Sequence, residues 1–224
     1  MQKIKYVFFD LDGTIFNSQS GISRSVIYAL EKFGIGNPED VVLRAFIGPP
    51  LKYSFMTHFG FDEEKAEQAI GYYREYYGRE GIFKGYPYEH IDDLLRILKS
   101  KGIISVLATS KPEEYAKRII SHLEFDDLFY HIAGADMAET RVEKADIIRY
   151  AADSLGINDM SEIVMVGDRK YDTIGAHEAG VRAVGVLYGF GTEAELRSVE
   201  TDYIAANVGE LLHVILNLSG LSEA

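Results

Sequence analysis

From Glu89 onward, strand-like and helix-like patterns alternate along the chain. Short apolar runs bounded by Gly, Asp or Thr alternate with segments whose apolar residues recur every three to four positions. The runs that predict strands are 103–108, 131–134, 163–166, 181–187 and 203–206. Such alternation is typical of a doubly wound parallel sheet that binds its ligand at the carboxyl ends of the strands. We therefore predict an α/β fold of this kind.

A further predicted strand lies near the N-terminus and ends in two acidic residues. Three apolar residues, 7–9, precede Asp10 and Asp12, which fall on one side of the extended chain because side chains alternate along a strand. Carboxylates this close repel each other and lose hydration, so they need a cation, a shared proton or a chemical task. In isolation, an acidic pair after a strand is a helix cap or a solvated loop about as often as it is a functional pair.

The segment between this strand and the next one is too long for a single crossover. Residues 13–108 separate Asp12 from Thr109, whereas a whole strand–helix–strand unit needs about 30 residues. The helical patterns in this segment begin near residues 18, 41, 51 and 62, and nothing between 17 and 85 alternates like a strand. We expect an all-helical cap domain, residues 17–85, inserted into a core domain of residues 1–16 and 86–224. Its two junctions would lie beside the acidic strand end, where a moving lid belongs.

Composition excludes several classes of function. The 224 residues include 23 basic and 35 acidic side chains, and a net charge of −12 argues against a nucleic-acid or anionic-membrane surface. Without cysteine there is no disulfide, thiolate nucleophile or cysteine-ligated metal. No apolar run approaches membrane-spanning length, and the first strand leaves no room for a signal peptide. We expect a cytoplasmic enzyme without nucleic-acid or membrane partners, either a monomer or a dimer.

Other predicted strand ends also carry groups suited to a phosphate or a divalent cation. Thr109 and Ser110 end one strand, and Asp168 ends another. Magnesium takes oxygen ligands, usually one or two carboxylates with waters and phosphate, and Asp10 with Asp168 would provide them. Lys144, at a predicted helix start, could place a positive charge against both Asp10 and a phosphate. Ordinary helix starts explain each group singly, but not their recurrence at strand end after strand end.

A calcium-binding helix–loop–helix also begins with the pattern Asp-x-Asp. That loop needs Gly at its sixth position and Glu at its twelfth, where this chain has Ile15 and Gly21. This alternative is therefore excluded.

Four motifs in order resemble those of the haloacid dehalogenase superfamily of phosphohydrolases. They are Asp10-Leu11-Asp12-Gly13-Thr14, then Thr109, then Lys144, then Gly167-Asp168 with Asp172. The resemblance spans the whole chain. The helical insert resembles the cap of the subgroup that contains phosphoglycolate phosphatases, and the stretches 47–51 and 188–191 strengthen that similarity.

The resemblance implies a Rossmann-like core and a two-step phosphoryl transfer with Mg²⁺. Asp10 would attack phosphorus to form an aspartyl-phosphate, and Asp12 would protonate the leaving group and then activate water. The implied magnesium ligands are the Asp10 carboxylate, the Asp12 backbone carbonyl and Asp168, with Asp172 in support. The implied phosphate-binding residues are Thr109, Ser110 and Lys144.

The sequence leaves open the roles of four basic residues besides Lys144. Many relatives follow the motif lysine with prolines, but Ala145 follows Lys144 here, so Arg141 is a possible substitute. Arg169 stands where a small residue is common and could bridge a neighbour or face the substrate. Arg44 and Lys52 of the insert could meet an anionic substrate.

We therefore predict a magnesium-dependent phosphomonoester hydrolase of a small phosphorylated metabolite, resembling phosphoglycolate phosphatase. The alternatives are a nucleoside 5′-monophosphate phosphatase, then a sugar-phosphate mutase, against which Thr14 weakly favours hydrolysis. A non-catalytic phospho-acceptor protein is a further alternative, but Asp12, which can activate water, argues against a long-lived phosphoaspartate.

Overall fold

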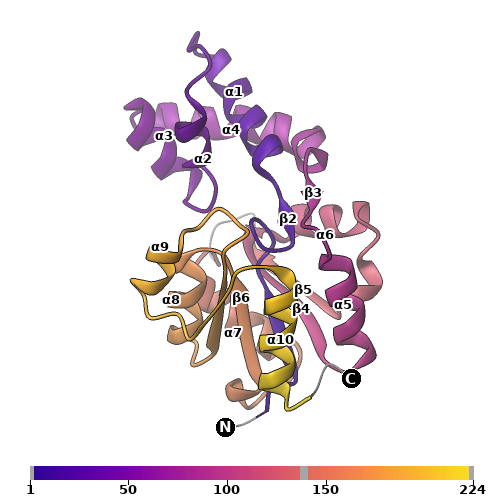
Figure 1. Cartoon of the computed structure of the whole chain (residues 1–224). Coiled ribbons are helices and arrows are strands. Elements are labelled where there is room, and N and C mark those ends of the chain that lie inside the picture. Colours follow the sequence, from indigo (N-terminus) through magenta and orange to yellow (C-terminus); the bar gives the residue numbers. More distant parts are fainter. Residues whose placement is uncertain (1–2, 137–140, 222–224) are drawn as a thin grey trace. The chain divides into compact units, whose positions relative to one another are not determined.

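The computed structural model describes residues 3–136 and 141–221 and contains two compact units. The core unit comprises Met1–Phe16 and Pro87–Ala224, and the helical unit comprises Asn17–Tyr86. Figure 1 shows the helical unit as a continuous stretch of chain that leaves the core after its first strand and returns to it before α5.

The core unit is built on a six-stranded parallel sheet with the order β5-β4-β1-β6-β7-β8. The strands are β1 (Tyr6–Phe9), β4 (Ile104–Pro112), β5 (His131–Ala135), β6 (Ile163–Gly167), β7 (Arg182–Val186) and β8 (Tyr203–Ala205). In the centre, Phe9 of β1 is in register with Leu107 of β4 and Val166 of β6. The parallel α/β fold predicted from the sequence is confirmed.

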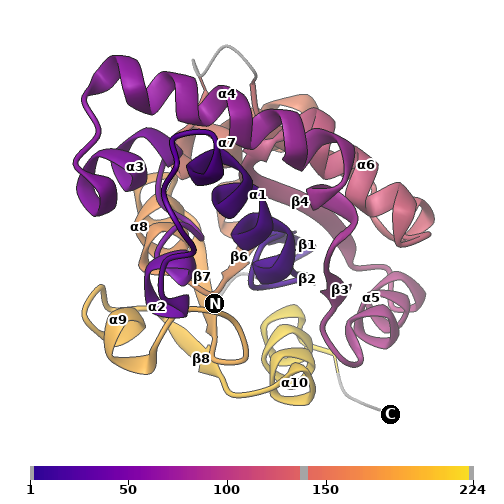
Figure 2. The ribbon, with the colours of Figure 1, turned by 90° about the horizontal axis from the view of Figure 1, so that it is seen from above.

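Helices cover both faces of this sheet. They are α5 (Ile91–Ser100), α6 (Glu113–His122), α7 (Lys144–Ser154), α8 (Lys170–Glu178), α9 (Glu193–Arg197) and α10 (Val208–Ser219), with 3₁₀ turns η2 (Asp126–Leu128) and η3 (Met160–Glu162). Figure 2 shows α5 and α10 on one side of the sheet and α7 and α8 on the other. On the α7 and α8 side, a buried core joins Phe8, Val106 and Met165 of the sheet to Ile147 and Ala176 of the helices. Each large apolar side chain buried there stabilises the fold by about 1.5–3 kcal/mol.

One strand is longer than the sequence predicts. The apolar run 103–108 predicts a strand, but β4 continues through Pro112 and α6 begins at Glu113. The strand extends because its pairing with β5 shifts register between Thr109 and Pro112, which is a bulge. A bulge depends on the partner strand, so the local sequence does not reveal it.

The helical unit contains α1 (Gln19–Glu31), α2 (Asp40–Arg44), α3 (Leu51–Phe59), α4 (Glu63–Arg79) and the 3₁₀ turn η1 (Gly81–Phe83). Tyr28 of α1 stacks on Tyr76 of α4, with ring centroids 5.2 Å apart, and Figure 2 shows these two helices side by side. Two short strands, β2 (Phe16–Asn17) and β3 (Tyr86–Pro87), pair where the chain enters and leaves this unit. Two-residue strands carry no readable period, so the sequence did not predict them.

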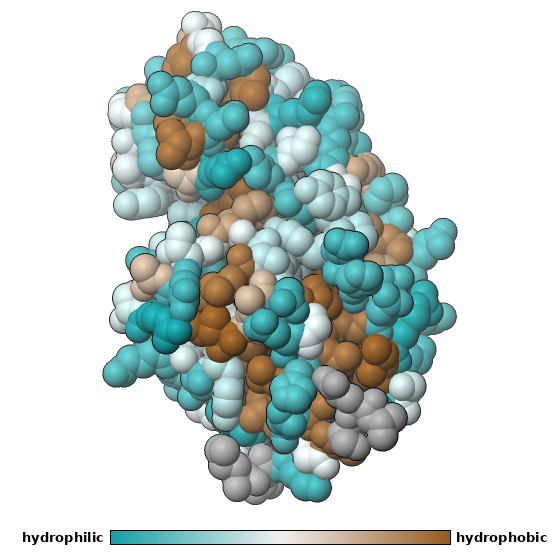
Figure 3. Space-filling view, viewed as in Figure 1, coloured by the Kyte–Doolittle hydropathy of each residue, from teal (hydrophilic) through white to brown (hydrophobic). Residues whose placement is uncertain are grey.

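Exposed large apolar side chains occur on several elements. The large apolar side chains that are exposed come from separate elements, among them Tyr53 of α3, Tyr130 before β5 and Ile174 of α8, and Figure 3 shows hydrophobic residues in several groups on one face. Within residues 3–136 and 141–221, no helix is both long and apolar enough to span a membrane.

Candidate active site

Three carboxylates meet at the carboxyl edge of the sheet. Asp10 directly follows β1, Asp168 directly follows β6, and Asp172 lies in the first turn of α8. One carboxylate oxygen of each lies within 4.8 Å of the others, close enough for a shared cation. The Asp10 amide donates to the carbonyl of Val166 (2.9 Å), which ties the first acidic residue to β6.

Lys144 lies between two of these carboxylates. Its Nζ is 2.8 Å from Asp10 Oδ1 and 2.9 Å from Asp172 Oδ1, and it also donates to the Ala108 carbonyl at 3.1 Å. The side chain is buried. Burial alone would lower the pKa of Lys144, but the carboxylates of Asp10 and Asp172 raise it above its ordinary value. The lysine therefore stays charged and neutralises part of the cluster.

Arg141, the alternative cation, is engaged elsewhere. Its Nε donates to the Gly134 carbonyl at 3.0 Å, a terminal nitrogen lies 3.6 Å from Glu113 Oε2, and the guanidinium lies 3.6 Å from the ring centroid of Tyr150. Of these two basic residues, the structure brings Lys144 to Asp10.

Lys144 pairs with Asp10 and Asp172, but within the described part of the chain no ammonium pairs with Asp168. Asp168 is fully buried, and its Oδ2 accepts hydrogen bonds from the amides of Phe190 (2.6 Å) and Gly191 (3.3 Å). Its Oδ1 is buried and has no hydrogen-bond partner within residues 3–136 and 141–221. Burial first, and then the nearby Asp172, raise the pKa of Asp168 well above its ordinary value. A buried carboxylate with an orphaned oxygen is suited to a divalent cation.

Glycines let the surrounding loops approach Asp168. Gly13 has a φ of +86°, and a Cβ there would collide with the Asp168 carboxylate. A Cβ at Gly189 would collide with the Asp168 side chain, and one at Gly191 with its backbone carbonyl. Two loops, one with Gly13 and one with Gly189 and Gly191, thus pack directly around one acid, and only glycine fits at these three positions.

The second acidic residue of the strand end has its own cation. Lys111 Nζ lies 2.7 Å from Asp12 Oδ2, and the side chains are 6% and 17% exposed. Asp12 Oδ1 is buried, and none of the residues that the structure describes forms a hydrogen bond with it. Lys111 is not among the site residues predicted from the sequence, although a lysine two positions after the motif threonine is a signal that could have found it.

Three predicted residues of the core unit remain: Thr109, Ser110 and Arg169. Thr109 is buried, and its Oγ1 accepts a hydrogen bond from the Lys111 amide at 3.2 Å, whereas Ser110 is exposed. Arg169 Nε contacts Glu195 Oε1 at 2.9 Å, which is the bridge to a neighbour considered above.

The two basic residues predicted in the insert lie on the helical unit. Arg44 is exposed at the end of α2. Lys52 Nζ lies 3.5 Å from Glu63 and 3.4 Å from Glu67 of α4, in ion pairs within the unit.

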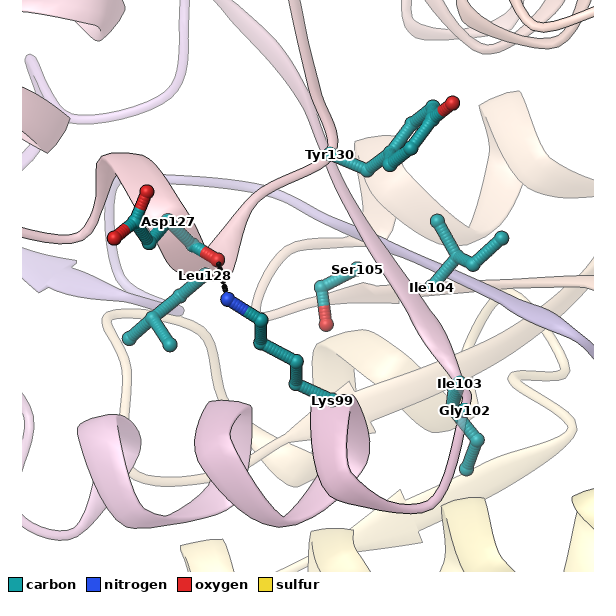
Figure 4. A pocket seen from close by; sticks show the side chains of 8 residues that line it. All are labelled: Lys99, Gly102, Ile103, Ile104, Ser105, Asp127, Leu128 and Tyr130. Atoms are coloured by element: carbon teal, nitrogen blue, oxygen red, sulfur yellow. Dashed lines mark hydrogen bonds between the residues drawn. The ribbon is translucent and has the colours of Figure 1, made fainter.

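A separate pocket of about 170 Å³ lies at the start of β4, away from the acidic cluster (Figure 4). Ile103, Ser105, Leu128 and Tyr130 line it, and Lys99 Nζ donates across it to the Asp127 carbonyl at 2.6 Å. None of the predicted site residues lines this pocket, so the acidic cluster is the candidate active site.

A family model provides an independent comparison. The model described as haloacid dehalogenase-like hydrolase matches residues 7–186. The chain belongs to this family. The match confirms the resemblance and the fold predicted from the sequence.

Relatives of known sequence or structure agree with this membership. A 5′-nucleotidase of Pseudomonas aeruginosa is 40% identical over 93% of this chain and 94% of its own length. A phosphoglycolate phosphatase of Haemophilus influenzae is 27% identical over 95% of this chain and 99% of its own length. The crystal structure of a predicted phosphatase from Clostridium acetobutylicum superposes with a TM-score of 0.91 at 43% identity, covering 96% of this chain and all of that one. At the level of enzyme class, a phosphatase, the prediction is confirmed.

Proposed function

We propose that this chain is a magnesium-dependent phosphomonoester hydrolase of the cytoplasm that acts on a small phosphorylated metabolite through an aspartyl-phosphate at Asp10. The observation that carries the proposal is the placement of Asp10 next to a buried ammonium, Lys144, and a buried carboxylate, Asp168, whose Oδ1 has no hydrogen-bond partner in the described part of the chain. Attack on a phosphate dianion needs this combination, because positive charge must offset the repulsion between the two anions.

The residues present fit a magnesium ion. The orphaned Oδ1 of Asp168 and the Asp10 carboxylate are hard oxygen ligands, and the Asp12 backbone carbonyl would be a third. Asp172 would support the site, since Lys144 already occupies its Oδ1. Bound Mg²⁺ would supply positive charge to the phosphoryl oxygens.

The side chains have separate tasks in the proposed reaction. Asp10 attacks phosphorus, which forms a bond from phosphorus to its carboxylate oxygen and breaks the ester bond, while Asp12 gives a proton to the leaving oxygen. Water then attacks the phosphoryl group, Asp12 takes a proton from it, and the bond to Asp10 breaks. Lys144 offsets the charge near Asp10, and Thr109 would bind a phosphoryl oxygen.

Two classes of substrate stand out. Phosphoglycolate is one, from the resemblance of the motifs and the Haemophilus relative. Nucleoside 5′-monophosphates are the second, and the higher identity of the Pseudomonas 5′-nucleotidase, 40% against 27%, favours them.

The test is phosphate release from p-nitrophenyl phosphate with Mg²⁺. We expect turnover that EDTA abolishes and that Asp10→Asn eliminates, while Asp92→Asn, an exposed aspartate on α5, has no effect. Full turnover by Asp10→Asn would refute the proposed nucleophile. A phosphoprotein that persists without multiple turnover would support the regulatory alternative instead. A screen of kcat/KM over 5′-nucleotides, 2-phosphoglycolate and hexose phosphates then ranks the substrates.

A further inference from the structure

We propose that Lys111 is a positioning residue that selects which oxygen of Asp12 transfers the proton. This inference rests on the proposed function, since it concerns Asp12 as the proton donor to the leaving group. It starts from the short contact between Lys111 Nζ and Asp12 Oδ2, 2.7 Å, in which both side chains are largely buried.

The fold holds Lys111 in place through the bulge at the end of β4. Thr109 pairs with Gly134 and Pro112 with Ala135, so Ser110 and Lys111 are extra residues on the β4 side. The Lys111 amide donates to Thr109 Oγ1 at 3.2 Å, which fixes the backbone of the bulge. A Cβ at Gly134 would lie 2.7 Å from the Lys111 carbonyl, so the neighbouring strand must carry glycine for the bulge to fit.

Stability alone is a poor reason for this ion pair. Removing two charges from water costs several kcal/mol per ion, and well-packed apolar residues in place of such a pair are often neutral or stabilising. The pair is also at the site of the chemistry, because Asp12 follows Asp10 by two residues. A role in orienting Asp12 explains why the chain keeps a buried lysine there.

The chemistry of the ammonium decides which oxygen carries the proton. A protonated lysine has three N–H donors and no acceptor, so a proton on Oδ2 would point at another donor. The proton of the acid form must therefore be on Oδ1, which is buried and has no hydrogen-bond partner among the described residues. In the first step the Oδ1–H bond breaks and the proton passes to the leaving oxygen; in the second step Oδ1 takes a proton from the attacking water.

The test uses the need of the leaving group for a proton. The test compares two esters. The alcohol of glycerol 2-phosphate, an alkyl ester, leaves as an alkoxide that needs the proton. The p-nitrophenolate of p-nitrophenyl phosphate, an aryl ester, leaves well without it. Values of kcat/KM report the transfer of the phosphoryl group to Asp10 for both esters. In Lys111→Met we expect kcat/KM to fall about 100-fold for the alkyl ester and less than about tenfold for the aryl ester. Lys111→Arg, which keeps the donors and the charge, should restore most of the loss.

The ratio of the two kcat/KM values is measured on one protein sample, so partial loss of folded enzyme cancels. Lys117→Met is the matched control, because Lys117 contacts Glu113 at 2.6 Å in an exposed ion pair; its ratio should equal that of the wild type. Equal losses on both esters in Lys111→Met would overturn the inference and make Lys111 a phosphate-binding or structural residue. If the wild type hydrolysed neither ester with Mg²⁺, the proposed function itself would fail.

Discussion

Replacement of Lys144 by methionine tests the electrostatic balance of the site. Methionine keeps most of the length of the side chain and removes the ammonium that contacts Asp10 at 2.8 Å and Asp172 at 2.9 Å. Three buried or half-buried carboxylates would then face one another without this ammonium. We expect a large loss in the free energy of unfolding in the presence of EDTA.

The magnitude follows from burial. Breaking a buried ion pair by removing one partner costs about 3–5 kcal/mol, because the remaining charge is left uncompensated. For a chain of this length, each kcal/mol lowers the melting temperature by about 2–4 °C, so the expected decrease is about 6–20 °C. Burial already raises the pKa of Asp172 above its ordinary value. The loss should therefore shrink at mildly acidic pH, where the cluster gains protons.

Lys52→Met is the matched control, because Lys52 also lies between two carboxylates, at 3.5 Å from Glu63 and 3.4 Å from Glu67, but is 40% exposed. Urea unfolding followed by far-UV circular dichroism, in EDTA at neutral pH, compares the two variants with the wild type. We expect no measurable change in Lys52→Met, since solvent screens exposed pairs. A loss in Lys144→Met below about 1 kcal/mol would refute the reasoning.

Two further predictions concern protonation. Because the pKa of Asp168 is raised above 3.8, the metal-free folded state binds a proton that the unfolded chain releases, so this residue lowers stability as pH rises above 3.8. At neutral pH in EDTA, Asp168→Asn should therefore be no less stable than the wild type. Mg²⁺ at 100 times its dissociation constant should stabilise the wild type by about 2.7 kcal/mol in thermal unfolding, and Asp168→Asn should lose this gain. An equal gain in both proteins would contradict the proposed ligand. Burial lowers the pKa of His131 below 6.5, so the unfolded chain binds more protons and stability falls as pH decreases through 6.5. His131→Phe should flatten this slope in urea unfolding at neutral and mildly acidic pH, and an unchanged slope would show that other groups cause it.

The sequence predicted those parts of the site that are fixed by local patterns. Asp10 and Asp168 directly follow short apolar runs, and parallel strands bring their carboxyl ends to one edge. Lys144 was placed correctly at a helix start because the helical period begins there. That it reaches Asp10 where Arg141 does not depends on side-chain contacts, which the sequence leaves open.

Contacts set by register or by distant loops could not be predicted. Lys111 reaches Asp12 because of a bulge that is defined by the partner strand. From the sequence, Ser110 was expected among the phosphate-binding residues, but it is exposed. Asp168 receives hydrogen bonds from the amides of Phe190 and Gly191, more than twenty residues along the chain. No periodic pattern records which loop approaches which strand end.

The close packing of Gly13, Gly189 and Gly191 on Asp168 has a consequence for how the protein can vary. Any missense mutation at these codons adds at least a Cβ, which has no space beside the acid. In a saturation library selected for activity, we expect these three positions to tolerate substitution as poorly as Asp168 itself, although none has a side chain that could take part in a reaction. Variation around this acid is thus limited by the space that the enclosing loops leave beside it.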